Sequence, residues 1–267
     1  MIPALPLQPD VALRLAGTPL SVLLDIDGTL APIAPRPEQA EVPPDTCKAL
    51  ESLIEISDAH VAMVTGRSVA DARRIIPIKG LGVIGNHGFE VLGEAGEVVS
   101  EPAAHSFLDA VAKAAKKLAS MPTEVPGVVL ENKGWTLSVH HRLASRPAIA
   151  GLTERVHSIA KELGLKVTRG KEVLELRPPL EVNKGTAAVL WVKRLGTSAS
   201  SSVLYVGDDR TDEDAFRELR AVFPRAVTIR VGDPDHDETT SAEFRVETPA
   251  EVKDFLVALV EARRGAR

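Results

Sequence analysis

The chain has 267 residues, of which 44% are hydrophobic, and a formal net charge of −5. This length and composition allow a sizeable buried core in one large or two modest domains, and we expect two. The negative charge lacks the basic footprint of a protein that binds nucleic acid or an anionic membrane, so an anionic ligand requires a local positive site.

Cysteine usage and the N-terminus indicate the compartment. The one cysteine, Cys47, cannot form an internal disulfide, and residues 1–6 lack a charged region followed by an apolar one. No apolar run approaches the roughly 18 residues of a membrane-spanning helix. We therefore expect a soluble, cytoplasmic, monomeric protein with no nucleic-acid or membrane partner.

Short apolar runs end abruptly in polar or glycine-rich turns, with helical patterns between them. The predicted strands are residues 20–24, 61–64, 81–84, 203–206 and 227–231, and the predicted helices are residues 44–56, 69–76, 183–195 and 212–219. Such apolar runs are typical of buried parallel strands. Their alternation with helices predicts an α/β fold, with a doubly wound, Rossmann-like parallel sheet.

The segment between the third and fourth of these strands has a different rhythm. Its predicted elements are helices at residues 103–119 and 147–163 and strands at residues 128–131, 135–142, 166–168 and 173–177. A segment of this size is too long for a loop and can form a small α+β domain. We expect a discontinuous core domain, residues 1–102 and 179–267, interrupted by an inserted cap domain, residues 103–178.

Polar side chains follow four of the predicted strands, at the edge where open parallel sheets bind ligands. The four segments are Asp25 to Asp27, Thr65-Gly66-Arg67, Gly85-Asn86-His87-Gly88 and Gly207 to Asp212. Neighbouring carboxylates repel one another unless a cation lies among them. Oxygen ligands without thiolates suit Mg²⁺.

Asp25 and Asp27 are the first candidates for chemistry. Two residues apart near a strand end, they can point to the same side and supply a nucleophile and a proton-transfer group. Gly28 permits a close turn past a ligand, and Thr29 can hydrogen-bond a phosphate oxygen. The competing interpretation is a simple Asp-Gly turn.

Asp208 and Asp212 lie four residues apart across a strand-to-helix turn and can bind a metal or its waters. Thr211 or Asp212 can also cap the following helix. Capping alone does not explain why Asp208 and Asp209 directly follow the predicted strand. Lys184, taken alone, is most simply a solvated lysine at a helix start.

These separated segments resemble the haloacid dehalogenase superfamily of phosphatases. The resemblance implies that Asp25 attacks phosphorus to form an aspartyl-phosphate, and that Asp27 protonates the leaving alcohol and then activates water. It also implies that Thr65 holds a phosphate oxygen and that Lys184 neutralises the nucleophile and the phosphate. The implied Mg²⁺ site consists of Asp25, Asp27 through its backbone carbonyl, Asp208 and Asp212.

The most distinctive stretch of the inserted segment is residues 131–142. Alternation puts Trp135, Leu137, Val139 and His141 on one face and Thr136, Ser138, His140 and Arg142 on the other. An amphipathic strand with a solvated polar face explains this pattern without any function.

The same stretch, however, is similar to the trehalose-6-phosphate phosphatase family, which shows Glu-Asn-Lys followed by Ser-x-His-x-Arg. Residues 85–88, 170–178 and 207–216 also match, and the resemblance spans about residues 20–220. It implies a phosphoric monoester hydrolase of trehalose biosynthesis that uses Mg²⁺ to convert trehalose 6-phosphate to trehalose and phosphate. The substrate-binding residues are then Gly66, Arg67, Asn86, His87, Glu131, Lys133, Arg142 and Glu175.

Three alternatives stay open at this point. The first is a related phosphatase of sucrose, mannosylglycerate or glucosylglycerol phosphate. The second is a sugar phosphotransferase or phosphomutase, which returns the phosphoryl group to a sugar. The third is a non-catalytic sugar-phosphate sensor, which the presence of all the residues expected for catalysis argues against.

Overall fold

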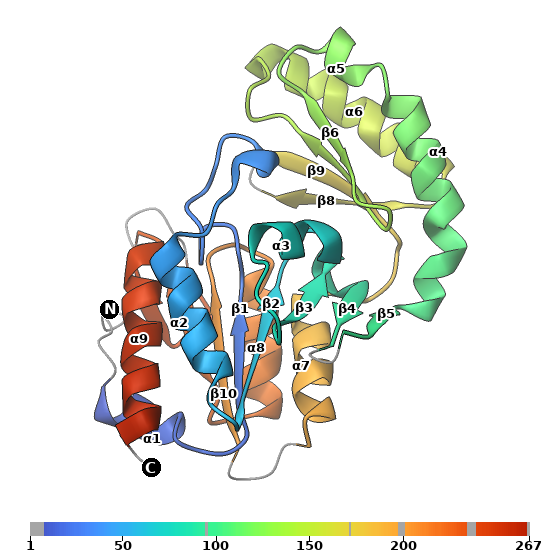
Figure 1. Cartoon of the computed structure of the whole chain (residues 1–267). Coiled ribbons are helices and arrows are strands. Elements are labelled where there is room, and N and C mark those ends of the chain that lie inside the picture. Colours follow the sequence, from blue (N-terminus) through green and yellow to red (C-terminus); the bar gives the residue numbers. More distant parts are fainter. Residues whose placement is uncertain (1–7, 94–95, 171, 197–200, 234–238, 266–267) are drawn as a thin grey trace. The chain divides into compact units, whose positions relative to one another are not determined.

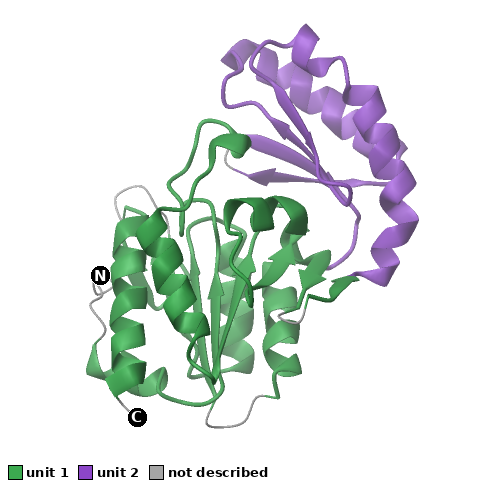
Figure 2. Cartoon of the chain, in the orientation of Figure 1, with its two compact units in different colours: residues 1–99, 182–267 green, residues 100–181 purple. Residues whose placement is uncertain are grey.

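A computed structural model describes residues 8–93, 96–170, 172–196, 201–233 and 239–265 (Figure 1). The chain forms two compact units, each described by itself (Figure 2). Unit 1 contains residues 1–99 and 182–267, and unit 2 contains residues 100–181. The predicted fold class is confirmed, because a mainly parallel sheet and a separate antiparallel sheet are both present. Among the described residues, no helix is both long and apolar enough to cross a membrane.

The sheet of unit 1 has the order β12-β11-β10-β1-β2-β3-β4-β5. The strands are β1 Leu20–Leu24, β2 Ala59–Val64, β3 Gly82–Gly85, β4 Glu90–Leu92, β5 Val98–Ser100, β10 Ser202–Gly207, β11 Val227–Val231 and β12 Phe244–Val246. Neighbours from β12 to β3 are parallel, and β4 runs antiparallel to β3. All five predicted strands are confirmed, whereas the three-residue strands β4, β5 and β12 are too short for a periodic signal.

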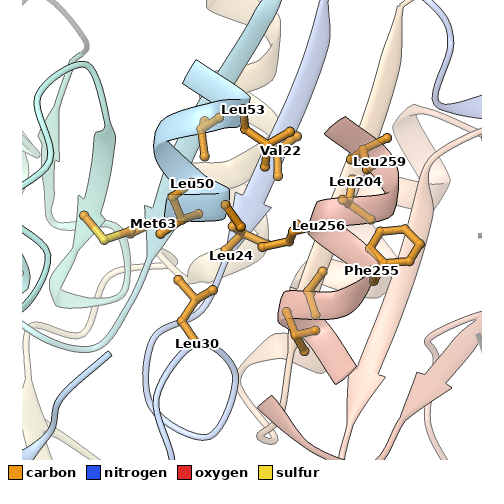
Figure 3. Packing of buried hydrophobic residues seen from close by; sticks show 14 of the residues in the cluster. Val22, Leu24, Leu30, Leu50, Leu53, Met63, Leu204, Phe255, Leu256 and Leu259 are labelled. Carbon is orange, nitrogen blue, oxygen red and sulfur yellow. The ribbon is translucent and has the colours of Figure 1, made fainter. Parts of the chain in front are cut away.

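Helices cover both faces of this sheet. The α-helices of unit 1 are α1 Pro9–Arg14, α2 Pro44–Ile54, α3 Val69–Ile75, α7 Lys184–Arg194, α8 Asp212–Val222 and α9 Pro249–Gly265, and the short 3₁₀ helices are η1 Pro37–Gln39 and η2 Asn86–Gly88. Leu24 of β1 belongs to a cluster with side chains of α2 and α9, as Figure 3 shows. Its neighbour Leu23 belongs to a second cluster, which contains Trp191 of α7 and Phe216 of α8. Burial of both faces explains why the strands are continuous apolar runs.

Unit 2 is an antiparallel sheet of order β6-β7-β9-β8, packed against helices. Its elements are η3 Pro102–Phe107, α4 Leu108–Leu118, α5 Met121–Glu124, β6 Val129–Asn132, β7 Leu137–His140, α6 Arg146–Glu162, β8 Lys166–Gly170 and β9 Val173–Arg177. Leu137 and Val139 of β7 pack in one cluster with Val111 of α4 and Val156 of α6. Apolar side chains on alternate positions therefore face the helices.

Two predicted elements of unit 2 are shorter than expected. The predicted helix at residues 103–119 is split into η3 and α4. In η3 the Ser106 hydroxyl donates to the Ala103 carbonyl oxygen at 3.0 Å, a local hydrogen bond that competes with a regular helix start. The strand predicted from residue 135 begins at Leu137 because Gly134, with φ +81°, forms the hairpin turn.

Candidate active site

The order β10-β1-β2-β3 brings four polar segments to one edge of the parallel sheet (Figure 1). Asp208 directly follows β10, Asp25 follows β1, Thr65 follows β2 and Asn86 follows β3. Because these four strands are parallel neighbours, their carboxyl ends meet at this edge. The sheet topology thus places residues from distant parts of the sequence beside one another.

Lys184 lies between two carboxylates at this edge. Its Nζ is 3.0 Å from Asp25 Oδ1 and 2.8 Å from Asp212 Oδ1, and its side chain is 2% exposed. Helix α7 begins at Lys184 because Asn183 and Thr186 form a capping box, in which each side chain accepts from the other backbone N–H. Burial alone would lower the pKa of Lys184, but Asp212 and Asp25 raise it well above its ordinary value. The interpretation as a solvated lysine is wrong.

Asp212 is held in place through both carboxylate oxygens. Its Oδ1 also accepts from the Tyr205 hydroxyl at 2.7 Å, and its Oδ2 accepts from the backbone N–H groups of Asp208 at 3.1 Å and Asp209 at 3.0 Å. Tyr205 was not predicted as a site residue, because a tyrosine within the apolar run of β10 is most simply a core side chain. Asp212 is fully buried, so these bonds fix its orientation.

Three carboxylates form a candidate cation site. Oxygens of Asp25, Asp208 and Asp212 all lie within 4.8 Å of one another. The Oδ1 atom of Asp208 is buried and finds no hydrogen-bond partner among the residues that the structure describes. Gly28 has φ +82°, and a Cβ there would lie 2.1 Å from Asp208 Oδ2. An all-oxygen ligand set with an unsatisfied buried oxygen fits a hard divalent cation.

The same carboxylates raise one another's pKa values. Burial raises the pKa of Asp25 well above its ordinary value, and Asp212 and Asp208 add to this, while Lys184 opposes it. Burial, together with Asp209 and Asp212, raises the pKa of Asp208 to about 8. A bound cation favours the ionised form of both groups, because an opposite charge nearby offsets burial and repulsion.

Asp209 has a structural task next to this group. Its Oδ1 accepts from the Thr211 backbone N–H and hydroxyl, each at 2.7 Å, and from the Asp212 N–H at 3.3 Å. Burial raises the pKa of Asp209, but Lys184 and Thr211 lower it to about 2. Capping by Thr211 or Asp212 was the wrong expectation, since neither side chain caps the start of α8 and Asp209 accepts from it instead.

Thr65 is oriented by the loop that follows it. Its hydroxyl oxygen accepts from the Arg67 backbone N–H at 3.1 Å, and its carbonyl oxygen accepts from the His87 N–H at 3.0 Å. A hydroxyl that accepts in this way retains its hydrogen to donate to a phosphate oxygen. Asn86 and His87 have φ +49° and +56°, and a Cβ on Gly66 would lie 2.6 Å from the His87 ring. Backbone strain of this kind is concentrated at functional sites.

Arg67 and Asp27 form a bidentate ion pair. Arg67 Nε donates to Asp27 Oδ2 and Nη2 donates to Oδ1, both at 2.7 Å, and Nη1 bonds Asp71. The Arg67 side chain is 7% exposed and that of Asp27 is 40% exposed. Burial lowers the pKa of Arg67, but the bonds to Asp27 and Asp71 raise it above its ordinary value.

Unit 2 holds a second polar group. Glu175 Oε1 accepts from Lys133 Nζ at 3.3 Å, from Thr136 Oγ1 at 3.1 Å and from Ser138 Oγ at 3.3 Å. The register places Ser138 of β7 opposite Glu175 of β9. Glu131 Oε2 lies 2.8 Å from His140 Nε2. These polar side chains bind one another, so a merely solvated face does not describe them.

Two further residues of the matching motifs complete the placement. Arg142 is exposed, two residues beyond the end of β7. Lys171, within the stretch 170–178, lies outside the described residues.

A family model described as trehalose-phosphatase matches residues 23–250. The chain belongs to the trehalose-phosphatase family. It is 37% identical over 250 residues to an uncharacterized glycosyl hydrolase of Mycobacterium tuberculosis, which covers 92% of this chain and 18% of that protein. It is 34% identical over 250 residues to a trehalose-phosphate phosphatase of Mycobacterium avium, which covers 92% of this chain and 63% of that protein.

The chain therefore spans less than two thirds of the length of these relatives. Among solved structures, the crystal structure of a trehalose-6-phosphate phosphatase related protein has a TM-score of 0.81 and 28% identity, and covers 92% of this chain and 100% of that chain. This similarity covers both units of the fold.

Proposed function

We propose that this chain hydrolyses trehalose 6-phosphate to trehalose and phosphate, in trehalose biosynthesis. The observation that carries the proposal is the group of Asp25 and Asp208 at the ends of adjacent strands, with the buried Lys184 beside Asp25, in a member of the trehalose-phosphatase family. Phosphate-monoester hydrolysis is among the slowest uncatalysed reactions, so it needs a nucleophile, charge neutralisation and proton transfer together.

Asp25 is the nucleophile in this proposal. In the first step a carboxylate oxygen of Asp25 bonds to phosphorus, the bond from phosphorus to the sugar oxygen breaks, and Asp27 gives that oxygen a proton. In the second step water attacks phosphorus, Asp27 takes a proton from the water, and Asp25 is released with phosphate. Lys184 neutralises charge on Asp25 and the phosphoryl group, and the Thr65 hydroxyl donates to a phosphoryl oxygen.

Mg²⁺ is the proposed cofactor. Asp25, the Asp27 backbone carbonyl and Asp208 would hold the ion. Asp208 Oδ1, which has no hydrogen-bond partner in the described part of the chain, supports this assignment. Asp212, whose oxygens already accept four hydrogen bonds, would orient these groups rather than bind the ion directly. When bound, Mg²⁺ supplies positive charge for the phosphoryl oxygens.

Substrate-binding residues are proposed in each unit by itself. In unit 2, Glu131, Lys133 and Glu175 offer charged acceptors and donors for sugar hydroxyls, with Arg142 near the sugar or the phosphate. In unit 1, Asn86 and His87 contribute through the loop that contacts Gly66. The Arg67 guanidinium already bonds two carboxylates, so its contribution to the substrate is indirect.

Phosphate release from a panel of substrates tests this proposal. The panel contains trehalose 6-phosphate, sucrose 6-phosphate, glucose 6-phosphate and the phosphates of mannosylglycerate and glucosylglycerol, each with Mg²⁺ or chelator. We expect preferential turnover of trehalose 6-phosphate and loss of activity in chelator and in Asp25→Asn. Equal turnover of glucose 6-phosphate would refute the sugar assignment, and phosphate release only in the presence of an acceptor sugar would indicate a phosphotransferase.

A further inference from the structure

We infer that Arg67 is the positioning residue of Asp27: it fixes the orientation of the carboxyl group that transfers protons. The inference rests on the proposed function, in which Asp27 protonates the leaving sugar oxygen. It assigns Arg67 a task in the first chemical step, separate from contact with the substrate.

The geometry of the pair carries the inference. Two N–H groups of one planar guanidinium, Nε and Nη2, each donate at 2.7 Å to a different oxygen of Asp27. A bidentate ion pair of this kind fixes the plane and the direction of the carboxyl group, which a single contact does not. The buried arginine thus anchors a carboxyl group that is 40% exposed.

Arg67 is itself held from behind. Its third nitrogen, Nη1, bonds Asp71 in the first turn of α3. The Ser68 hydroxyl caps this helix by accepting from the Asp71 N–H at 3.1 Å, and Arg74 bonds Asp71 Oδ1 at 3.0 and 2.8 Å. Asp27 is therefore linked through Arg67 and Asp71 to the start of a capped helix.

The Arg67 backbone is fixed as well. Its N–H donates to Thr65 Oγ1 at 3.1 Å, and its carbonyl oxygen accepts from the Asn86 N–H at 2.7 Å. One residue thus contacts the proposed phosphate-binding hydroxyl through its backbone and the proposed proton donor through its side chain. This arrangement sets the proton donor relative to the phosphate site.

A positioning role makes a specific kinetic prediction. A sugar oxygen leaves poorly unless it receives a proton as its bond to phosphorus breaks, whereas p-nitrophenolate leaves without one. Loss of the Asp27 orientation should therefore slow the first step for a sugar phosphate and affect p-nitrophenyl phosphate far less. A purely structural role for Arg67 would slow both substrates alike.

The experiment measures single-turnover release of the leaving group, which reports the first step alone, in Arg67→Met. We expect the rate with trehalose 6-phosphate to fall by about 10²-fold, as for a misplaced catalytic group, and the rate with p-nitrophenyl phosphate by less than about 5-fold. Arg67→Lys keeps the charge without the bidentate geometry. Its single-turnover rates should show the same selectivity between the two substrates with a smaller loss.

Two controls make the result decisive. Arg73→Met removes an exposed arginine of the same helix that takes no part in this network, and should change neither rate by more than about 2-fold, as for an exposed residue. When Asp27 is already replaced by Asn, adding Arg67→Met should lower the rate with the sugar phosphate by less than about a further 3-fold, because the two residues act as one unit.

The outcomes separate this inference from the proposed function. Equal losses with both substrates, or a full additional loss in the Asp27→Asn background, would overturn the positioning role. If the wild-type protein does not release trehalose from trehalose 6-phosphate, the proposed function fails instead. The comparison of Arg67→Met with wild type then uses whichever sugar phosphate the panel identifies.

Discussion

The polar residues of unit 1 follow strands that are buried on both faces, whereas those of unit 2 alternate with apolar residues along its strands. In unit 1, Asp25, Lys184 and Asp212 come from three separate segments and share one chain of buried contacts. In unit 2, Glu175 gathers donors from neighbouring positions of one sheet face, while Leu174 and Leu176 pack in the apolar cluster.

In the proposed function, this difference separates chemistry from recognition. A change to one member of the buried group in unit 1 leaves its partners with unmatched charge, so the group tolerates little variation. The polar face of unit 2 can change side chain by side chain without disturbing the apolar face. We therefore expect changes to the group of Asp25, Lys184 and Asp212 in unit 1 to affect every phosphate ester, and changes to the polar face of unit 2 to affect sugar phosphates selectively.

Lys184→Met tests the role assigned to the buried group of unit 1 and should have the largest effect. Removal of the ammonium group leaves Asp25 and Asp212 without their shared cation, so activity on any phosphate ester should fall by about 10²- to 10³-fold. The free energy of unfolding should fall by about 3–5 kcal/mol, as for a broken buried pair. Phosphate release and urea unfolding measure both effects.

Lys193→Met, an exposed change on the same helix, is the matched control and should leave both quantities near wild type. Activity of Lys184→Met within tenfold of wild type would contradict the role assigned to this residue.

Glu175→Gln tests the recognition role proposed for the polar face of unit 2. The change keeps the shape but removes the charge that accepts from Lys133, which corresponds to about 1.5–3 kcal/mol for a charged hydrogen bond. We expect kcat/KM for the sugar phosphate to fall by about 10- to 100-fold. Turnover of p-nitrophenyl phosphate should fall much less. Glu154→Gln, an exposed change on α6, serves as control, and equal losses on both substrates would count against separate recognition.

Binding of Mg²⁺ should depend on pH. Because the pKa of Asp208 is raised to about 8 in the metal-free protein, protons compete with the ion below that pH. Titration calorimetry should show an apparent affinity that falls by at least about tenfold for each pH unit below 8, with at least one proton displaced. An affinity that is the same at pH 6 and pH 8 would contradict this.

The same pKa shift has a consequence for stability. Between pH of about 4 and 8, the metal-free native state binds more protons at Asp208 than the unfolded state, so the free energy of unfolding falls as pH rises. Added Mg²⁺ should therefore raise the melting temperature more at pH 8 than at pH 6. Thermal melts with and without the ion measure the difference.

Tyr205→Phe should have the smallest effect. It removes one hydrogen-bond donor to Asp212 and leaves the Lys184 contact, so the free energy of unfolding should fall by about 1 kcal/mol. Urea unfolding with an unchanged slope measures this, and a loss above about 3 kcal/mol would mean that Tyr205 supports the buried group more than one hydrogen bond allows.

The strands of unit 1 could be predicted because their apolar runs have a simple physical cause, which is burial on both faces. The edge at which Asp25, Thr65 and Asp208 meet followed from the same rule, since parallel strands share the direction of their carboxyl ends. Pairings between side chains did not follow. The bond from Tyr205 to Asp212 and the pair of Arg67 with Asp27 depend on rotamers and distances that no spacing encodes.

Local competition explains the remaining differences. Thr211 carries a good capping side chain, but Asp209 bonds its N–H and hydroxyl, so the aspartate takes the capping task. Strand β12 was missed because three residues give no period. Lys184 was indistinguishable from a solvated lysine until the fold placed it between Asp25 and Asp212.

The most direct test of the central claim is to trap the covalent intermediate. The protein is mixed with trehalose 6-phosphate and Mg²⁺ and quenched in acid within one turnover, and the aspartyl-phosphate is reduced with borohydride and located by peptide mass spectrometry. We predict modification at Asp25 in the wild-type protein and none in Asp25→Asn. Modification at another residue, or turnover of trehalose 6-phosphate by Asp25→Asn at the wild-type rate, would contradict the account.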